Sequence, residues 1–422
     1  MRILALTNWY PPHHYGGYEL SCFDVMTRLA RRGHDVAVLC SDQRLPGAVP
    51  DDAGHEAVVE RSLRLYHDGE DLVRPGWRGR RAIEAHNRQV LAAALDRHRP
   101  DVVSAWHLAG LSQGLLALLA ERQVPVAFAV CDEWPAFAWK LDPWSRPFTD
   151  DPARRGGRVW ERAPVRWLRR AAGRLVERAT GLPVVPVDAG ALGPALWVTA
   201  DLRRRTEPRS RHTFAAHTVV HSGIDRTVYP PVAPADRPWS GRLVSTGRFD
   251  PRKGFETVIR ALPLLPDDTT LALWGRGGEA EQRRLQHIAD DLGVGDRVTM
   301  GSRRRDEMPA AYAAGDVFVF PSEWAEPFGL VPVEAMACGT PVVATGVGGS
   351  SEFLRDGENC LLFRPGDPED LARVVKAVAA DPALRSTLVA GGHRTAEALD
   401  VERLADVMER WHAWTASRCQ AP

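Results

Sequence analysis

The sequence predicts an α/β protein with two doubly wound parallel sheets, one in each half of the chain. Short apolar runs alternate with amphipathic stretches through the first half, and the same alternation starts again near residue 242. Buried parallel strands appear in a sequence as continuous apolar runs, and the helices between them return the chain across the sheet. The length of 422 residues fits two domains, because a single core seldom grows beyond about 250–300 residues.

The individual elements follow from this alternation. In the first half, strands are expected at 3–7, 36–41, 101–106 and 124–130, and helices at 19–32, 81–97 and 111–122. In the second half, strands are expected at 242–247, 270–274, 297–300, 317–321, 341–345 and 360–363, and helices at 255–264, 279–292, 305–314, 329–337 and 369–380. Both series are Rossmann-like, and ligands of such sheets bind at the carboxyl ends of the strands. We therefore expect two facing domains with an interdomain cleft.

The domain boundaries are placed where the alternation stops. The N-terminal domain is assigned to residues 1–215 and the C-terminal domain to 216–398, with the junction inside a segment rich in Pro and Arg, 201–240. Residues 399–422 contain a helical pattern that is expected to cross back to the N-terminal domain.

Residues 135–195 do not follow the alternation and are treated as an irregular insertion rich in Trp and Arg. The stretch 158–178 has a helical pattern with seven Arg and two Glu. It is expected either to pack on the first domain with a solvated basic face or to contact an anionic acceptor or a membrane interface. The tryptophans in and beside the insertion are Trp134, Trp139, Trp144, Trp160 and Trp167.

The composition excludes several classes of protein. Lys+Arg and Asp+Glu are equal at 54 each, so global charge favours neither a nucleic-acid partner nor a membrane surface. No apolar run approaches about 18 residues, so no transmembrane helix is expected. The N-terminus has the pattern of a first strand rather than a signal peptide, and the six cysteines are scattered without a Cys-x-x-Cys pair. These features indicate a cytoplasmic protein with reduced thiols and no zinc site.

The segment Glu326-Pro-Phe-Gly-Leu-Val-Pro-Val-Glu334 is the most informative stretch of the chain. It follows a predicted strand and opens a predicted helix, so its two carboxylates bracket a helix N-terminus. A helix N-terminus attracts anions, and carboxylates accept hydrogen bonds from hydroxyls. The segment could therefore hold a sugar, a diphosphate and a ribose together. The alternative is an ordinary strand–loop–helix unit with two solvated glutamates.

A second motif, Gly247-Arg-Phe-Asp-Pro-Arg-Lys-Gly254, follows the first strand of the second domain. Arg248 offers a planar fork to phosphate oxygens and Lys253 a compact charge, so together they could neutralise a diphosphate. Only three of the basic residues are lysines, which makes Lys253 unusual in this chain. The alternative is a surface turn with two ordinary cations.

These two motifs, together with residues 314–322, 335–344 and Gly348-Gly349, resemble glycosyltransferase family 4. The family contains retaining, nucleotide-sugar-dependent enzymes of the GT-B fold. In the first half, Trp9-Tyr-Pro-Pro-His-His-Tyr-Gly-Gly-Tyr-Glu19 is similar to the family's glycine loop, and His107 follows a strand as the family's cleft histidine does. The resemblance covers most of residues 1–395 but is weak over 135–195.

The resemblance implies a role for each matching residue. Glu334 would bind the ribose, Glu326 the hydroxyls of the donor sugar, Arg248 and Lys253 the diphosphate, and His107 the sugar near its reacting carbon. For His107 the alternative is a hydrogen-bonded structural histidine at a strand end. Gly16 and Gly17 would let the backbone approach the donor closely. Further donor-binding candidates are Phe328, Gly329, Leu330, Ser302 and Arg303, and the acceptor candidates are Asp132, Glu133, His13 and His14.

The reaction expected from this resemblance is transfer of a sugar from a nucleotide diphosphate sugar to a hydroxyl acceptor, in carbohydrate or secondary-metabolite biosynthesis. Retention requires either a carboxylate nucleophile or attack from the side of departure, and we expect front-face substitution because Glu326 is thought to face away from the anomeric carbon. No Asp-x-Asp motif stands in the cleft loops of the second domain, so neither a metal nor another cofactor is expected.

Three other functions stay open at this point. They are a phosphorylase of the same fold, which would need a lysine for pyridoxal phosphate, an epimerase, and a non-catalytic protein that binds nucleotide sugars or glycans. An NAD-dependent oxidoreductase is disfavoured because no Gly-x-Gly-x-x-Gly follows the first strand.

Overall fold

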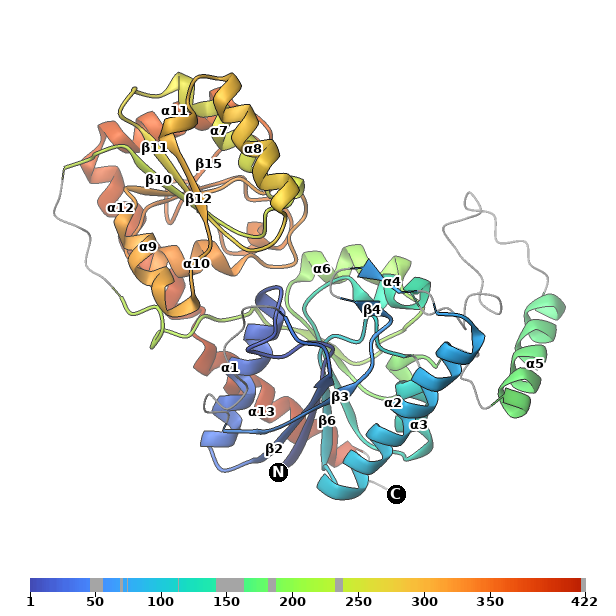
Figure 1. The fold of residues 1–422 in the computed structure, drawn as a ribbon. Helices are drawn as coiled ribbons and strands as arrows, with labels where there is room; N and C mark the ends of the chain where they lie inside the picture. The colour runs from blue at the N-terminus through green and yellow to red at the C-terminus, as the bar shows by residue number, and fades with distance from the viewer. Residues whose placement is uncertain are drawn as a thin grey trace. The chain divides into compact units, whose positions relative to one another are not determined.

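The computed structural model describes residues 1–45, 56–68, 71–73, 75–112, 114–141, 163–180, 187–231 and 238–418. The chain divides into two compact units, Met1–Val220 with Ala405–Pro422 and His221–Leu404. Each unit has a parallel sheet flanked by helices (Figure 1), which confirms the predicted α/β fold with two Rossmann-like sheets.

The first unit is built on a seven-stranded sheet in the order β3-β2-β1-β6-β7-β8-β9, and all neighbouring strands are parallel. The sequence prediction missed three of these strands. β3 is half-exposed at the sheet edge and carries Glu60 and Arg61, so it lacks the apolar run of a central strand, while β8 and β9 have only three residues each. The strands are β1 (Arg2–Leu6), β2 (Asp35–Ser41), β3 (Val58–Leu63), β6 (Val102–Ala105), β7 (Val126–Val130), β8 (Ala195–Trp197) and β9 (His217–Val219).

Because β9 belongs to the first sheet, the first unit extends to Val220, a few residues beyond the boundary placed at 215. A separate antiparallel pair is formed by β4 (His67–Asp68) and β5 (Asp71–Leu72). The helices of this unit are α1 (Gly17–Arg31), α2 (Trp77–His98), α3 (Gly114–Glu121), α4 (Trp134–Leu141), α5 (Ala163–Thr180) and α6 (Ala200–Thr206), with short 3-10 turns η3 (Ala189–Ala191) and η4 (Glu207–Arg209).

The second unit is built on a six-stranded parallel sheet in the order β12-β11-β10-β13-β14-β15. Its central strand β13 is Val-Phe-Val-Phe, and β-branched and aromatic residues of this kind favour a strand that is buried on both faces. The strands are β10 (Arg242–Thr246), β11 (Thr270–Trp274), β12 (Val298–Gly301), β13 (Val317–Phe320), β14 (Val342–Ala344) and β15 (Leu361–Leu362).

Helices cover both faces of this second sheet, with α7, α8 and α11 on one side and α9, α10 and α12 on the other (Figure 1). Aspartates cap the N-termini of α11 and α12. Asp367 accepts the Asp370 N–H at 2.8 Å in α11, and Asp381 accepts the Ala383 N–H at 2.9 Å in α12. The helices are α7 (Phe255–Ala261), α8 (Glu279–Asp291), α9 (Met308–Ala314), α10 (Leu330–Ala337), α11 (Pro368–Ala380) and α12 (Pro382–Ala398), with 3-10 turns η5 (Pro251–Lys253), η6 (Leu262–Leu264), η7 (Gly295–Arg297), η8 (Arg305–Glu307) and η9 (Gly349–Glu352).

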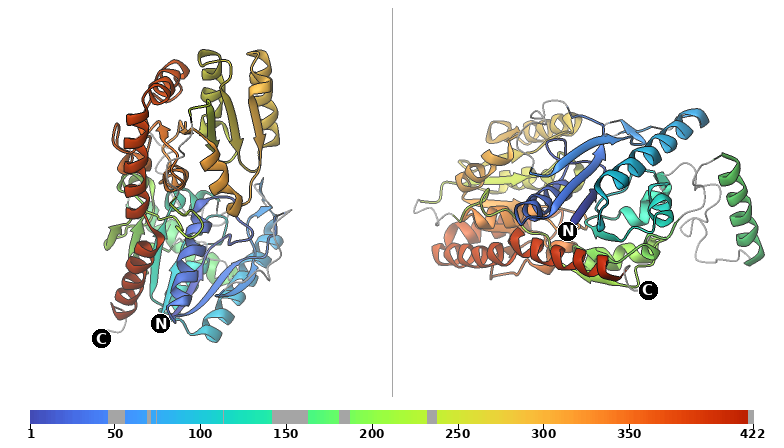
Figure 2. Two further views of the ribbon diagram at one scale, coloured as in Figure 1. Left: turned by 90° about the vertical axis from the view of Figure 1, so that its left-hand side faces the viewer. Right: turned by 90° about the horizontal axis from the view of Figure 1, so that it is seen from below.

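The last helix, α13 (Val401–Arg418), runs from the second unit into the first and lies beside the first sheet (Figure 2). His412 on α13 is buried and hydrogen-bonds through Nε2 to Ser104 Oγ of β6 at 2.9 Å. Glu409 binds Arg32 and His34, both at 2.9 Å, in the turn between α1 and β2. These contacts tie the helix to the first unit.

Part of the predicted insertion lies outside the described residues, including Trp144, Trp160 and the side chains of Trp139 and Trp167. Trp134 is fully buried, whereas Leu168 and Leu175 of α5 are exposed. The five described cysteines are free thiols, and Cys419 is outside the described residues. Over those same residues, no helix is long and apolar enough to cross a membrane.

Candidate active site

The carboxyl ends of β10 and β13, which are neighbours in the second sheet, bring the two sequence motifs together. The loop after β10 closes with Gly254, whose φ of +70° disfavours any side chain. A Cβ on Gly254 would lie 2.0 Å from the carbonyl oxygen of Pro321, in the loop after β13. Glycine at this position therefore allows the two motif-bearing loops to pack backbone against backbone.

Lys253 and Glu326 form an ion pair between the two loops, in which Lys253 Nζ donates to Glu326 Oε1. Glu326 is only 6% exposed and also accepts a hydrogen bond from Ser322 Oγ at 3.1 Å. A buried carboxylate needs a partner of opposite charge, and Lys253 supplies it. The two residues that the sequence assigned to the diphosphate and the sugar thus lie in direct contact.

The backbone around Glu326 is fixed by the segment after β14. Gly349 N–H donates to the carbonyl oxygen of Glu326 at 2.7 Å. Gly348 has a φ of +69°, and a Cβ there would lie 2.6 Å from the Ala325 backbone. The glycine pair noted in the sequence therefore holds Glu326 in position.

Glu334 lies on α10, one turn inside the helix that Gly329 begins with a φ of +94°. Tyr312 Oη donates to Glu334 Oε2 at 2.7 Å. Burial is the main cause that raises the pKa of Tyr312 and of Tyr229 well above the usual phenol range, and the negative charge of Glu334 raises both further. Both phenols are therefore neutral hydrogen-bond donors. The sequence reasoning missed these tyrosines because neither is near Glu334 along the chain.

Phe328, Gly329 and Leu330 form the entry to α10, as the sequence predicted. Phe328 is buried against Phe353 and His221, at ring-centroid separations of 4.9 and 5.5 Å. The phenylalanine therefore anchors the loop, and its backbone rather than its side chain is what could face a ligand.

Arg248 differs from its neighbours in the same loop. It is half-buried, and no described residue makes a hydrogen bond or ion pair with its guanidinium. Arg252, which the sequence did not single out, pairs with Asp250 at 2.6 Å and stacks on Trp324, with its guanidinium carbon 4.8 Å from the ring centroid. The hydrogen bond from Arg252 is the main reason why the pKa of Asp250 is lowered to about 2. Arg248 is thus the cation of this loop that is left for an anionic ligand.

Ser302 and Arg303 follow β12 and are both exposed. The Arg303 guanidinium lies over the Trp274 ring, 4.3 Å from its centroid, at the end of the neighbouring strand β11. Trp274 is a further aromatic surface at this sheet edge that the sequence reasoning did not identify.

In the first unit, His107 follows β6 and is 8% exposed. Its Nδ1 lies 2.8 Å from Asn8 Nδ2, and its Nε2 lies 2.7 Å from Asp132 Oδ2. The Tyr18 ring stacks on the imidazole at a centroid separation of 4.6 Å. The structure therefore joins two predicted site residues, His107 and Asp132, and adds two that sequence reasoning missed.

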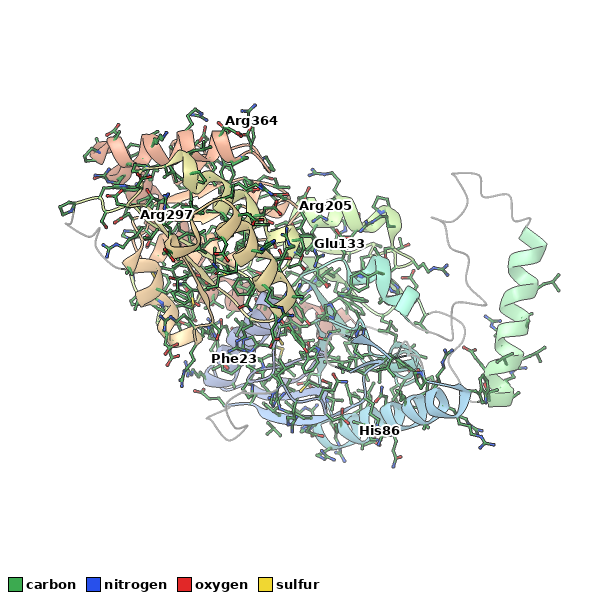
Figure 3. The ribbon with its side chains drawn as sticks, turned by 45° about the horizontal axis from the view of Figure 1, so that its top comes forward. Phe23, His86, Glu133, Arg205, Arg297 and Arg364 are labelled. Atoms are coloured by element: carbon green, nitrogen blue, oxygen red, sulfur yellow. The ribbon has the colours of Figure 1, made fainter. Side chains whose placement is uncertain are left out.

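The other acceptor candidates are already engaged in the structure. Glu133 forms ion pairs with Arg205 and Arg209, and Figure 3 shows Glu133 and Arg205 side by side. His13 is buried and accepts the Leu45 N–H at 3.1 Å. His14 Nδ1 lies 3.2 Å from the carbonyl oxygen of Pro12. All three stabilise loops of the first unit, so the fold accounts for them without a ligand.

The glycine loop is held by Glu19, a fully buried residue in the first turn of α1. Its carboxylate accepts the N–H groups of Tyr15 and Gly16, both at 3.0 Å. Burial raises the pKa of Glu19 to about 7. Gly17 begins α1, and Gly16 precedes it with an extended φ of −153°.

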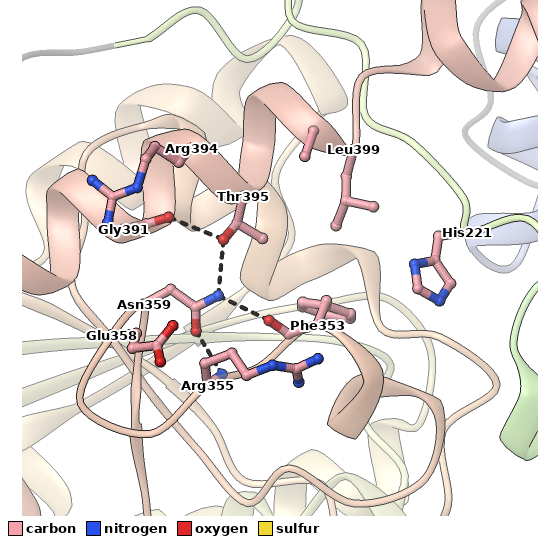
Figure 4. Close-up of a pocket in the computed structure, with 10 residues that line it drawn as sticks. His221, Phe353, Arg355, Glu358, Asn359, Gly391, Arg394, Thr395 and Leu399 are labelled. Carbon is pink, nitrogen blue, oxygen red and sulfur yellow. Dashed lines mark hydrogen bonds between the residues drawn. The ribbon is translucent and has the colours of Figure 1, made fainter.

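A separate pocket of about 320 Å³ in the second unit contains none of the predicted site residues (Figure 4). Its polar groups bind one another: Asn359 Nδ2 donates to Phe353 O and to Thr395 Oγ1, both at 2.8 Å, and Thr395 Oγ1 donates to Gly391 O at 2.9 Å. These bonds hold a turn against α12. Among the described residues, no group of three or more His, Cys, Asp or Glu is arranged to hold a metal ion.

Comparisons with known proteins match both units. The family described as "Glycosyl transferases group 1" matches residues 240–394, and "Glycosyltransferase Family 4" matches residues 15–177. The lipopolysaccharide core biosynthesis glycosyltransferase LpsE of Rhizobium meliloti is 42% identical over 41% of this chain and 50% of its own length. A D-inositol 3-phosphate glycosyltransferase of Mycolicibacterium vanbaalenii is 39% identical over 40% of this chain and 42% of its own length. The chain thus aligns with half or less of these two relatives.

A glycogen synthase of Mycobacterium tuberculosis is 28% identical over 91% of this chain and 87% of its own length. Among solved structures, sucrose-phosphate synthase from Thermosynechococcus elongatus has a TM-score of 0.70 at 22% identity, covering 99% of this chain and 100% of its own. Anabaena HepE, solved with UDP and glucose, has a TM-score of 0.65 at 21% identity, covering 97% of this chain and 98% of its own. At these identities the likeness to solved structures shows the fold, which is GT-B.

Proposed function

Because the chain belongs to the family 4 glycosyltransferases of the GT-B fold, we propose that it transfers a sugar from a nucleotide diphosphate sugar to a hydroxyl acceptor, with retention of configuration. One observation carries the proposal. The Lys253–Glu326 ion pair and Glu334 meet where β10 and β13 end and α10 begins, which is where such a sheet binds its ligand. HepE, which shares the fold, was solved with UDP and with UDP-glucose, and this supports a nucleotide-linked donor.

The diphosphate of the donor would bind between Arg248, Lys253 and the N-terminus of α10. Arg248 has no ion-pair partner among the described residues, so an anion would complete its electrostatic environment. Lys253 donates one hydrogen bond to Glu326 and could contact a phosphate oxygen with another of its three protons. The backbone N–H groups of Phe328, Gly329 and Leu330 would add donors at the helix start.

The nucleoside would be held through its ribose by Glu334. Glu334 accepts a hydrogen bond from Tyr312 at 2.7 Å and interacts with Tyr229 as well, and because a carboxylate has about four acceptor sites, ribose hydroxyls could bind the same group. Ser302 and Arg303 would lie near the base, where the exposed Arg303 guanidinium stacked on the half-buried Trp274 ring offers a planar surface. Glu326 would accept hydrogen bonds from hydroxyls of the sugar, and His107 would bind the sugar near its reacting carbon.

The proposed chemistry is front-face substitution. The acceptor oxygen forms a bond to the anomeric carbon while the bond from that carbon to the diphosphate oxygen breaks, and the electron pair stays on the diphosphate. The acceptor proton passes to a phosphate oxygen of the leaving group. Arg248, Lys253 and the α10 N-terminus would stabilise the negative charge that develops, without a metal or another cofactor.

The glycine loop supports a ligand-facing role for Gly16. A Cβ at residue 16 would have an ordinary contact of 3.5 Å with Glu19 Oε2, and the extended backbone there suits any residue. The fold itself therefore does not require glycine at this position. A glycine at residue 16 would instead let the sugar donor approach the backbone closely, or the acceptor that Asp132 would face.

A thermal-shift panel of nucleoside diphosphates and their sugars tests the donor. A ligand at a hundred times its dissociation constant stabilises a protein by about 2.7 kcal/mol, so a true donor should raise Tm clearly. Incubation of that donor with hydroxyl acceptors, followed by NMR of the anomeric proton of the product, tests retention. Stabilisation without turnover over a broad acceptor panel would favour the non-catalytic binding protein, and an absence of stabilisation by every nucleotide would refute the proposal.

A further inference from the structure

The polar network around His107 determines which ring nitrogen of the imidazole carries the proton. The role in sugar transfer that we infer from this protonation rests on the proposed function. Asn8 is the starting point, because its amide orientation is set by two backbone groups. Trp9 N–H donates to Asn8 Oδ1 at 2.8 Å, and Asn8 Nδ2 donates to the carbonyl oxygen of Ala109 at 3.2 Å. A backbone N–H can only donate and a carbonyl can only accept, so a flipped amide would lose both bonds.

With the amide in this orientation, the second proton on Asn8 Nδ2 points at His107 Nδ1, 2.8 Å away. Nδ1 must therefore accept, and a neutral imidazole that accepts at Nδ1 carries its proton at Nε2. That proton is donated to Asp132 Oδ2 at 2.7 Å. Double protonation would place an N–H of the imidazole against an N–H of the amide. The network thus favours one neutral tautomer.

We propose that Asn8 is a positioning residue that keeps His107 neutral and protonated at Nε2, so that His107 serves the transfer reaction as a hydrogen-bond donor and not as a base. A base needs a free lone pair, and here Nδ1 accepts from Asn8 while Nε2 carries the proton. This differs from a histidine–carboxylate pair in which the carboxylate binds Nδ1–H and leaves Nε2 free to take a proton.

The arrangement also indicates how a sugar would bind. A hydroxyl both accepts and donates, so one sugar hydroxyl can insert between His107 Nε2–H and the Asp132 carboxylate and satisfy both. Neutrality matters because the sugar develops positive charge in an oxocarbenium-like transition state. An imidazolium beside it would be repelled by that charge, whereas a neutral donor would not.

The test compares Asn8→Asp with Tyr18→Phe. Asn8→Asp preserves shape but replaces the amide donor with a carboxylate, which demands a proton at His107 Nδ1. Tyr18→Phe removes the hydroxyl that donates to Asn8 Oδ1 at 3.0 Å and also contacts Glu19, but it leaves the Asn8 amide in place and keeps the ring that stacks on His107. The ring nitrogens are observed by long-range 1H–15N NMR of the full chain with labelled histidine, and His107 is assigned from the signals lost in His107→Gln.

In the unaltered protein at neutral pH, we expect His107 Nε2 to be protonated and Nδ1 unprotonated, and Tyr18→Phe should leave this pattern unchanged. Asn8→Asp should show both nitrogens protonated, with a kcat about 10- to 100-fold lower and an unchanged dissociation constant for the nucleoside diphosphate. An unprotonated Nε2 in the unaltered protein, an unchanged ring in Asn8→Asp, or a doubly protonated ring with full kcat would each overturn the inference.

The spectrum is read without substrate, so it separates this inference from the proposed function. If no nucleotide sugar is turned over, the proposed function fails and the positioning role with it, but the tautomer assignment is still decided by the spectrum. If His107→Gln transfers sugar at the full rate, the positioning role is overturned while the glycosyltransferase activity stands.

Discussion

The two units place polar side chains at the carboxyl ends of their central strands in different ways. In the second unit the site consists of charged groups from two compact motifs, with Lys253 paired to Glu326 across neighbouring loops. In the first unit the corresponding position is filled by a hydrogen-bonded network that joins Asn8, Tyr18, His107 and Asp132 from separate segments. A site of the first kind can be recognised from a local pattern of charged residues, whereas a hydrogen-bonded network of the second kind forms only when distant segments meet.

The glycines of the two sites show the same contrast. Gly348 adopts a φ of +69° and would collide with the Ala325 backbone if it carried a side chain, so the fold itself requires it. Gly16 has an extended φ, and a Cβ there would make only an ordinary contact with Glu19, so the fold does not require glycine at this position. In the second unit, Gly348 is needed to hold the backbone at Glu326. In the first unit, no such structural need applies to Gly16, and we propose that it contacts a ligand.

The largest effect is expected from breaking the Lys253–Glu326 pair. Removal of a cation proposed to stabilise the leaving diphosphate should lower the transfer rate about 10²- to 10³-fold, so Lys253→Met should lose most activity in a radiolabelled-donor assay. Glu326→Gln should also lose most activity, because it removes the carboxylate that is proposed to bind the sugar hydroxyls and that holds Lys253 in place. Lys253→Met also leaves the buried Glu326 carboxylate without its partner, which typically costs about 3–5 kcal/mol. Glu326→Gln should cost less stability, because the Lys253 side chain that it leaves unpaired is 20% exposed.

The double variant Lys253→Met/Glu326→Gln separates these two effects. It should recover much of the stability lost in the single variants, measured by urea denaturation, but none of the activity. Single variants that keep the unaltered rate would contradict the assignment of both residues.

The next effect concerns Glu19, the buried carboxyl that holds the glycine loop of the first unit. Its folded pKa of about 7 lies above the ordinary value of 4.5, so the folded state binds the proton more tightly. The resulting stability is complete below pH 4.5 and is lost as the pH rises to about 7, a change of roughly 3 kcal/mol. Glu19→Gln should remove this slope, and the measurement is the difference in unfolding free energy between the two proteins from pH 4.5 to pH 8.

The unfolding free energies of the two proteins must be compared, because two buried histidines change the stability with pH in the opposite direction to Glu19. Burial lowers the pKa of His212 and of His412 to about 4, so their contribution is present above pH 6.5 and is lost as the pH falls. Parallel pH profiles for the unaltered protein and Glu19→Gln would show that Glu19 does not titrate in this window.

A smaller effect is expected at Glu334, which tests whether the second unit holds the nucleoside. Glu334→Gln keeps the size of the side chain but removes the charge that strengthens bonds from ribose hydroxyls. Hydrogen bonds to a charged group contribute about 1.5–3 kcal/mol, so the dissociation constant of the nucleoside diphosphate should rise about 10- to 100-fold in calorimetry. 2′,3′-Dideoxyribose analogues serve as the control, since they lack both hydroxyls and should bind the variant and the unaltered protein with nearly equal affinity.

The smallest effect on stability is expected for Gly16→Ala, paired with Gly348→Ala as its counterpart in the other unit. Gly16→Ala should change the free energy of unfolding by less than about 1 kcal/mol and still reduce transfer, because the added methyl would meet the ligand that we propose binds beside this loop. Gly348→Ala should lose both stability and activity. Equal destabilisation by the two substitutions in thermal unfolding would remove the distinction drawn between the glycines.

Much of the fold could be predicted from the sequence, and so could the candidate site residues that the second unit brings together. The central strands, such as Val317–Phe320, are continuous apolar runs because both of their faces are buried, and that pattern is visible without a structure. Edge strands such as β3 are exposed on one side and carry charges, so their pattern is weak. Residues 135–195 had no pattern to match, and much of this segment lies outside the described residues.

For the site, the sequence by itself determined the charged groups of the second unit, because Arg248, Lys253, Glu326 and Glu334 belong to short motifs whose loops and helix start are local structures. It also identified His107 and Asp132, but as separate candidates with separate partners. Only the tertiary structure decided that they bind each other, that Glu133 and His13 are used by the fold, and that Asn8 sets the hydrogen bonding of His107. The physical reason is that a hydrogen bond depends on two atoms meeting within about 3 Å, which packing of distant segments determines and residue order does not.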